Sequence, residues 1–189
     1  MELYWYCIKD MDSAAYEKAL SMMDSTRRKR IGELAAENDR KRSVAAELLA
    51  RQALGEKLGC APQDVPLRRD EDDKPYLEGN PWYVSLSHSG QYAVCALGEK
   101  PLGVDVEVIR TTEEKFMRRV CTEQELAYVR PYEEGGFARF FECWTAKEAL
   151  FKLTGKGPML KLSRFELPEH VALDFIVKNG CALTVAIEL

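Results

Sequence analysis

The chain has 189 residues, of which 46% are hydrophobic and 31% are charged, a composition typical of a globular protein with one domain or two joined halves. Its formal net charge of −4 excludes a molecule that binds polyanions over its whole surface, so any attraction for phosphate is expected to be local. No segment reaches membrane-spanning length and no basic region precedes the apolar start, so neither a transmembrane helix nor a signal peptide is expected.

The cysteines are scattered and include no Cys-x-x-Cys pair, which argues against a disulfide framework and against a zinc site. Several lie in apolar runs, where a buried, reduced thiol is the usual state. They are Cys7, Cys60, Cys95, Cys121, Cys143 and Cys181. The expected compartment is therefore the reducing cytoplasm.

The first elements expected are a strand and two helices. Residues 3–8 are rich in aromatic side chains and predict a strand, and residues 13–23 predict a short amphipathic helix with Ser13 as its N-cap. A second helix is expected to end at about Leu58. Its apolar residues recur at i, i+3 and i+4, and they are Val44, Ala45, Leu48, Leu49 and Leu54.

A basic cluster stands out in this acidic chain. Seven positive charges lie within sixteen residues, in the runs Arg27-Arg28-Lys29-Arg30 and Arg40-Lys41-Arg42. A solvated helix face is the ordinary interpretation of such a run, and nucleic-acid binding is another. Arginine also binds phosphate groups with two parallel hydrogen bonds, so a phosphate ligand is a third interpretation.

Residues 61–81 contain four prolines and an acidic run, and they predict a loop. Residues 82–86 predict a strand, residues 87–90 a polar turn and residues 91–97 the returning strand of a hairpin. Residues 98–101, Gly-Glu-Lys-Pro, are the expected junction between two halves of the chain.

In the second half, residues 104–108 alternate valine with acid, which is strand spacing. Val104, Val106 and Val108 are therefore expected on one face, with Asp105 and Glu107 side by side on the other. Two carboxylates that close repel each other unless a cation lies between them.

Residues 112–120 and 122–130 predict two short helices, and Thr122-x-x-Glu125 has the pattern of a capping box. After a break at residues 131–136, a helix from about Phe137 carries an aromatic face, and Glu148 lies in the middle of that face. Its aromatic members are Phe137, Phe140, Phe141, Trp144 and Phe151.

An ionised carboxylate in such apolar surroundings is costly, and Lys147 and Lys152 flank it. If Glu148 and the two strand carboxylates surround one hard cation, the cation offsets both the repulsion between Asp105 and Glu107 and the cost of burying the Glu148 charge. Oxygen ligands of this kind suit Mg²⁺. The alternative interpretation is that the strand is an ordinary sheet edge and that the helix simply carries Glu148 in a salt bridge at an unusual, apolar position.

Gly155-Lys156-Gly157-Pro158 is expected to end the long helix. Residues 165–167, 172–177 and 181–189 predict closing antiparallel strands.

Two linked motifs carry a resemblance to a known family. Gly103-Val104-Asp105-Val106-Glu107, followed by Trp144-Thr145-Ala146-Lys147-Glu148-Ala149-Leu150-Phe151-Lys152, resembles the signature of the 4′-phosphopantetheinyl transferases, in their longer, surfactin-synthetase-activating type. The resemblance implies an α+β fold of two pseudo-symmetric halves, each a small antiparallel sheet packed with helices, with the active site in the cleft between them. The halves would be residues 1–97, with the coenzyme-binding residues, and residues 98–189, with the metal-binding motifs. No internal repeat is visible in the sequence.

The resemblance also implies roles for individual residues. The metal ligands would be Asp105, Glu107 and Glu148, binding Mg²⁺, with Mn²⁺ as the alternative metal. The coenzyme A ligands would be Arg27, Arg30, Arg42, Lys74, Ser87 and His88. The catalytic residues would be Glu148, Lys147, Lys152 and Glu123. Family members usually carry an asparagine where this chain has Ser85, which puts one local hydrogen bond in doubt.

The implied reaction transfers 4′-phosphopantetheine from coenzyme A to a serine of an apo acyl or peptidyl carrier protein and releases adenosine 3′,5′-bisphosphate. Metal and lysines would supply the electrostatic stabilisation, and Glu123 or a metal-bound water would act as the base. Glu123 is equally explained as a favourable acid in a first helical turn. The carrier stays undetermined, and the two-halved type implies a monomer that uses neither nucleic acid nor membrane.

Two other classes of protein are alternatives. A nucleic-acid-binding module would use the Arg27–Arg42 cluster, but it would leave Glu148 without a purpose. A serine hydrolase built on Ser87 or Ser89 with His88 is weaker, because the chain has no Gly-x-Ser-x-Gly elbow and neighbouring strand residues point apart.

Overall fold

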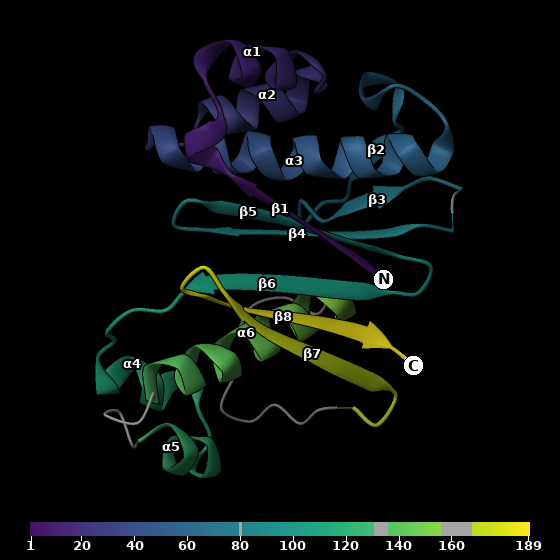
Figure 1. Ribbon diagram of the computed structural model, residues 1–189. Helices are drawn as coiled ribbons and strands as arrows, with labels where there is room; N and C mark the ends of the chain where they lie inside the picture. The colour runs from purple at the N-terminus through teal and green to yellow at the C-terminus, as the bar shows by residue number, and fades with distance from the viewer. Residues whose placement is uncertain (80, 131–135, 156–167) are drawn as a thin grey trace. The chain divides into compact units, whose positions relative to one another are not determined.

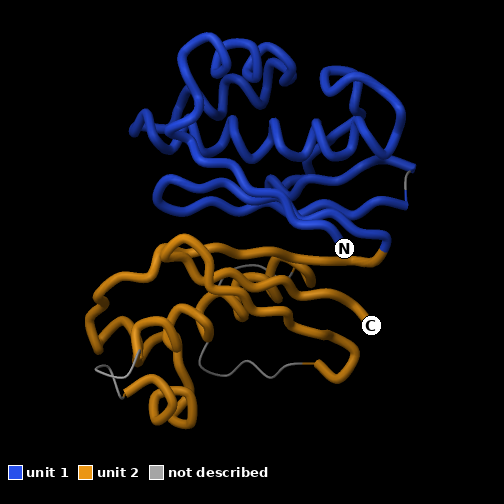
Figure 2. Tube along the Cα trace, in the orientation of Figure 1, with its two compact units in different colours: residues 1–99 blue, residues 100–189 orange. Residues whose placement is uncertain are grey.

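The computed structural model describes residues 1–79, 81–130, 136–155 and 168–189 (Figure 1). The predicted strand at 165–167 lies outside this part of the chain, as does most of the predicted break at 131–136. The chain divides into two compact units, Met1–Glu99 and Lys100–Leu189 (Figure 2), and the division falls within the expected junction. No helix of the described residues is long and apolar enough to cross a membrane.

Unit 1 is an antiparallel sheet with the strand order β1-β5-β4, covered by helices. Figure 1 shows the long helix α3 lying along this sheet, with α1 and α2 on the far side of α3. The elements are β1 (Glu2–Cys7), α1 (Ser13–Ser21), α2 (Ser25–Gly32), α3 (Glu37–Leu58), β2 (Leu67–Arg69), β3 (Pro75–Leu77), β4 (Tyr83–Ser89) and β5 (Tyr92–Gly98), with short 3₁₀ turns at Ile8–Asp10 and Pro62–Asp64. The core of the unit joins Val44 and Leu54 of α3 to Ala93, Cys95 and Leu97 of β5.

Three predictions for unit 1 need correction. The N-cap of α1 is Asp12, whose carboxylate accepts a 2.7 Å hydrogen bond from Ala15 N, and not Ser13. The predicted loop at 61–81 contains the short hairpin of β2 and β3, in which the buried Leu67 and Leu77 pair. The polar turn is shorter than predicted, because β4 continues to Ser89 and the chain reverses at Gly90, where φ is +57°.

Unit 2 is an antiparallel sheet with the order β6-β8-β7, and helix α6 packs on it. The elements are β6 (Leu102–Val108), α4 (Glu114–Val120), α5 (Glu123–Val129), α6 (Gly136–Thr154), β7 (Val171–Lys178) and β8 (Cys181–Glu188). The predicted helices of this half are confirmed, as are its predicted strands at 104–108, 172–177 and 181–189. Gly155, with φ of +66°, follows the last residue of α6 as expected. The predicted aromatic residues of α6 belong to one hydrophobic cluster.

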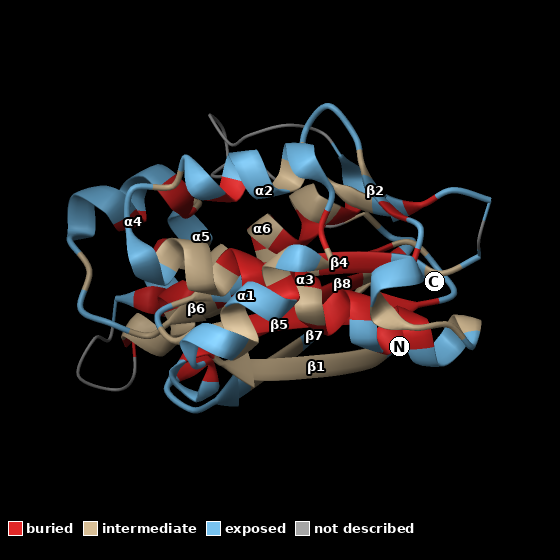
Figure 3. Ribbon diagram, turned by 90° about the horizontal axis from the view of Figure 1, so that it is seen from above, coloured by how far each residue is buried: buried red, intermediate tan, exposed pale blue. Residues whose placement is uncertain are grey.

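The two sheets share one connectivity. In each unit the first strand pairs with the last, and the last two strands form a hairpin. The central strands, β5 and β8, are buried along most of their length (Figure 3). The α+β class with two such halves is therefore confirmed, although the sequence showed no repeat.

Candidate active site

Strand β6 presents its two acidic residues to helix α6. Gly103 shares their face, and a Cβ atom on Gly103 would lie 2.0 Å from the carbonyl oxygen of Ala149 and 2.5 Å from the amide nitrogen of Leu153. Glycine at this position therefore allows the backbone of α6 to lie directly on β6. Since strand residues alternate, Asp105 and Glu107 also face this side.

Helix α6 is held against the sheet by two polar contacts, one on each side of Glu148. The hydroxyls of Thr145 and Thr184 share a buried hydrogen bond of 2.8 Å, and Thr184 is the β8 partner of Asp105. Lys152 Nζ donates to Asp105 Oδ1 at 2.8 Å and to the carbonyl oxygen of Val104 at 3.0 Å. Thr145, Glu148 and Lys152 are spaced by three and four residues, so they lie on one side of the helix.

Glu148 therefore lies among charged groups in a partly buried position. Burial raises the pKa of its carboxyl group to about 7, and the neighbouring Asp105 and Glu107 carboxylates act in the same direction, while Lys152 opposes them. Glu148 Oε1 is buried and has no hydrogen-bond partner among the described residues. A carboxylate in this situation is stabilised by a cation.

The donor set fits a hard divalent cation such as Mg²⁺, because it offers only carboxylate oxygens and one of them is buried and unsatisfied. Within the ranges that the structure describes, no three acidic, histidine or cysteine side chains are gathered closely enough to hold a metal ion. Asp105 is paired with Lys152, and Glu107 Oε2 lies 3.2 Å from Arg110 Nη1. The three carboxylates are neighbours, and two of them are paired with basic side chains.

Lys147 lies apart from these carboxylates. Its Nζ donates to the carbonyl oxygen of Val120 at 2.7 Å and to Glu125 Oε2 at 2.6 Å, and its side chain is buried. Consecutive helix residues point about 100° apart, so Lys147 cannot share the direction of Glu148. The structure brings Lys152, and not Lys147, to Asp105.

Glu123 is exposed at the first position of α5. The predicted capping box is confirmed, and it uses Thr122 and Glu125: Glu125 N donates to Thr122 Oγ1 at 3.2 Å, and Thr122 N donates to Glu125 Oε2 at 2.6 Å. Glu125 thus connects the start of α5 to Lys147, a role that the sequence interpretation missed.

In unit 1, the basic residues of α2 meet two acids. Arg27 Nε donates to Glu47 Oε2 at 2.9 Å, and Arg27 Nη1 donates to Asp73 Oδ2 at 3.2 Å. Arg30 Nη1 lies 3.2 Å from Asp73 Oδ1. Burial lowers the pKa of Lys74, which follows Asp73 in the turn before β3. Arg27, Arg30 and Lys74 are therefore gathered around one turn.

Three residues of this neighbourhood were not predicted from the sequence: Glu47, Arg51 and Arg69. The buried Glu47 carboxylate accepts hydrogen bonds from Arg51 at 3.1 Å and from Arg69 at 3.0 Å, besides the one from Arg27. The sequence could have indicated the pair of Glu47 and Arg51, because Glu47 interrupts the apolar run of α3 and Arg51 is its i+4 partner.

Arg42 and His88 lie near the turn between β4 and β5. Arg42 Nη1 donates to the carbonyl oxygen of Gly90 at 2.6 Å, and its Nη2 pairs with Asp39 in the first turn of α3. His88 is exposed, whereas Ser87 is buried. Because successive strand residues face opposite sides, Ser87 and His88 do not share a face of β4, which argues against the serine-hydrolase alternative.

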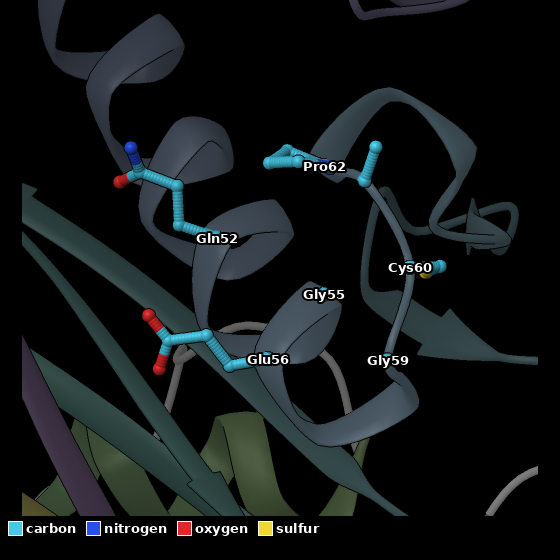
Figure 4. A pocket seen from close by; sticks show the side chains of 7 residues that line it. Gln52, Gly55, Glu56, Gly59, Cys60 and Pro62 are labelled. Carbon is cyan, nitrogen blue, oxygen red and sulfur yellow. The ribbon is translucent and has the colours of Figure 1, made fainter.

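The described residues also line two cavities, one in each unit. A cavity of about 390 Å³ beside the end of α3 is lined by Gln52, Gly55, Glu56, Gly59, Cys60, Ala61 and Pro62 (Figure 4), and no predicted site residue lines it. A second cavity of about 230 Å³ lies in unit 2 beside the pair of Glu125 and Lys147.

Comparisons with known proteins match both halves. Residues 101–187 match the family described as the 4′-phosphopantetheinyl transferase superfamily, and residues 10–100 match the one described as 4′-phosphopantetheinyl transferase, N-terminal. Among similar proteins, the 4′-phosphopantetheinyl transferase HetI of a Nostoc species is 30% identical, over 78% of this chain and 71% of HetI. The 4′-phosphopantetheinyl transferase gsp of Aneurinibacillus migulanus is 29% identical, over 75% of this chain and 60% of that protein. The 4′-phosphopantetheinyl transferase Sfp of Bacillus subtilis is 22% identical, over 90% of this chain and 77% of Sfp.

Proposed function

The chain belongs to the 4′-phosphopantetheinyl transferase superfamily, and on this premise we propose that it transfers 4′-phosphopantetheine from coenzyme A to a serine of an apo carrier protein, releasing adenosine 3′,5′-bisphosphate. The observation that carries the proposal is the buried, unsatisfied Glu148 carboxylate on α6, which lies close enough to Asp105 and Glu107 of β6 for their charges to raise its pKa. Such a group has no purpose in a protein that only binds a ligand through its basic residues.

In this proposal Asp105, Glu107 and Glu148 hold Mg²⁺, with Mn²⁺ as the alternative. When bound, the metal neutralises negative charge on the diphosphate of coenzyme A. Lys152 contacts Asp105, and its ammonium group is proposed to stabilise charge on the same diphosphate. Lys147 acts indirectly: its contacts with Glu125 and Val120 orient the helix that carries Glu148.

Coenzyme binding is assigned to unit 1. Arg42 and His88, at the β4–β5 turn, and Lys74, at the β2–β3 turn, are proposed to bind the 3′-phosphate, and Arg27 and Arg30 the diphosphate. Ser87 is buried on the other face of β4, so its proposed contribution is to support this strand.

For the proton of the carrier serine, the family pattern offers Glu123 as one candidate base. Its exposed position at the start of α5 supports access to a large protein substrate. The same position supports the simpler role of an acid that stabilises a helix start. Substitution by glutamine separates the two roles, as developed below.

The proposed partners are coenzyme A and an acyl or peptidyl carrier protein, with the chain acting as a monomer. All six cysteines are free, which supports a reducing cytoplasm as the compartment. Nucleic-acid binding is disfavoured as a second function, because it would leave the buried and unsatisfied Glu148 carboxylate without a purpose.

The test is mass spectrometry of apo carrier proteins from fatty-acid, polyketide and peptide synthesis, each incubated with the protein, coenzyme A and Mg²⁺. At least one carrier is expected to gain the mass of one phosphopantetheine group. Asp105→Asn should abolish the gain while the protein stays folded. Asp174→Asn is the matched control, because it removes the same charge from an exposed position on β7. Near-native transfer by Asp105→Asn would refute the proposed site.

A further inference from the structure

Unit 1 contains a layered network of arginines and acids. Its inner layer is the buried Glu47, which binds Arg27, Arg51 and Arg69, and the exposed fraction of the Glu47 side chain is only 3%. A buried carboxylate with three guanidinium partners holds their side chains in defined positions. The buried Glu47 carboxylate therefore holds the guanidinium groups of Arg27 and Arg69 in place.

The outer layer is Asp73, whose side chain is 28% exposed. Its Oδ2 accepts a hydrogen bond from Arg27 Nη1 at 3.2 Å, and its Oδ1 lies 3.2 Å from Arg30 Nη1 and 3.5 Å from Arg69 Nη1. Three guanidinium groups from α2 and β2 therefore converge on a single carboxylate at the surface. Arg69 is further held by the hydrogen bond from its Nη1 to the carbonyl oxygen of Asp73, at 2.7 Å.

The charges of this network do not balance. It has four arginines (Arg27, Arg30, Arg51, Arg69) and two acids (Glu47, Asp73), so its net charge is 4 − 2 = +2. Without the Asp73 carboxylate the surplus would be +3, concentrated on the outer guanidinium groups. Carboxylate and phosphate oxygens are bound by guanidinium in the same way, with charge-assisted hydrogen bonds. The Asp73 carboxylate thus occupies a position that suits a phosphate.

The backbone at Asp73 holds this carboxylate in place without blocking its replacement. Asp73 has φ of +65°, a left-handed conformation that aspartate and asparagine tolerate better than most residues. The turn is built by Asp70, whose Oδ1 accepts hydrogen bonds from the backbone nitrogens of Asp72 at 3.0 Å and Lys74 at 2.8 Å. Because Asp70 forms the turn, the Asp73 side chain can rotate away while the turn stays intact.

We propose that Asp73 is an intramolecular competitor of the phosphate ligand: a ligand phosphate replaces its carboxylate on Arg27, Arg30 and Arg69, and Asp73 thereby sets the affinity. Arg69 is then a phosphate-binding residue in addition to those assigned above. The inference rests on the proposed function only for the identity of the ligand, a diphosphate of a coenzyme. The network itself makes a site for any compact phosphate anion.

The test compares Asp73→Asn with Asp72→Asn by isothermal titration calorimetry, using inorganic pyrophosphate and coenzyme A as separate probes. Asparagine keeps the backbone conformation and the shape of residue 73 but removes the charge that binds the arginines. Asp72 is exposed in the same turn, and its substitution changes the net charge equally. Asp73→Asn is expected to bind both probes about tenfold more tightly than Asp72→Asn, the effect of losing one charge-assisted competitor.

Arg69 provides the second arm. In the background of Asp73→Asn, Arg69→Gln should remove most of the gain in affinity for pyrophosphate, and thermal melting of each variant shows that it is folded. Equal affinities of Asp73→Asn and Asp72→Asn for pyrophosphate, or no detectable pyrophosphate binding by Asp73→Asn, would overturn the inference. Neither result would contradict the proposed function, because that function is tested by modification of a carrier protein by the native protein. Conversely, tighter pyrophosphate binding by a protein that modifies no carrier would sustain the inference and refute the proposed function.

Discussion

Replacing Glu148 with glutamine should stabilise the metal-free protein at pH 8 and have little effect at pH 4.5. Burial, with Asp105 and Glu107 nearby, raises the pKa of this carboxyl group from 4.5 to about 7. Between these two values the folded chain keeps a proton that the unfolded chain has released. The free energy of unfolding of the native protein therefore falls as the pH rises through this window. Above the window, the ionised Glu148 carboxylate destabilises the folded state by the full amount. Glutamine does not ionise and lacks this dependence.

The size of the effect follows from the pKa. Each pKa unit corresponds to about 1.4 kcal/mol, so the complete change would cost the native protein about 3 kcal/mol at pH 8. Partial exposure of Glu148 screens the charge and reduces the expected difference to about 1–3 kcal/mol. For a chain of this length, that difference corresponds to a rise in melting temperature of about 3–10 °C in the variant.

The assay is thermal melting of both proteins in buffers with a chelator, from pH 4.5 to pH 8. Glu142→Gln is the matched control, because Glu142 lies on the same helix and accepts an exposed hydrogen bond from the Tyr128 hydroxyl at 2.9 Å. This control should show no gain at pH 8. A difference between Glu148→Gln and the native protein that is the same at both pH values would refute the reasoning, since it could not come from ionisation of Glu148.

Three further predictions concern other parts of the site. Gly103→Ala should destabilise the protein by about 3 kcal/mol in urea unfolding, because its Cβ would lie 2.0 Å from the Ala149 carbonyl oxygen; an unchanged midpoint would contradict the close packing of α6 on β6. His88→Ala should weaken coenzyme A binding about tenfold in calorimetry but leave the affinity for dephospho-coenzyme A nearly unchanged, because one charge-assisted hydrogen bond to the 3′-phosphate is lost; equal losses for both ligands would remove His88 from that role. Glu123→Gln should retain native kcat with saturating carrier, because its exposed position is explained by the helix start; a fall of about 10²–10⁴ would instead identify it as the base.

The elements that the sequence predicted well depend on local signals. The alternation of residues 104–108 is enough to place Asp105 and Glu107 on one face of β6, because side chains alternate on any strand. The capping box at Thr122 and Glu125 acts within one helical turn, so it too can be predicted without the rest of the fold. The periodicity of α6 likewise placed Glu148 and Lys152 on one side of the helix.

What the sequence could not predict depends on residues that are distant along the chain. The three-residue strands β2 and β3 are too short to show a period, and they are stabilised by pairing with each other. Strand β4 continues past His88 because Ser87–Ser89 pair with residues of β5, which overrides the polar character of that segment.

The sequence by itself determined the family motifs and the carboxylates proposed to hold a metal, since these follow from residue types and short spacings, and the α+β class followed from the family resemblance that the motifs carry. Only the tertiary structure decided how the basic residues are used. Lys147 turns to Glu125 because a helix points consecutive side chains in different directions. Arg27 and Arg30 are bound to Asp73 because folding brings α2 to a turn more than forty residues further along the chain. Ion pairs of this kind depend on how close two charges lie in space, and the order of residues alone does not contain that distance.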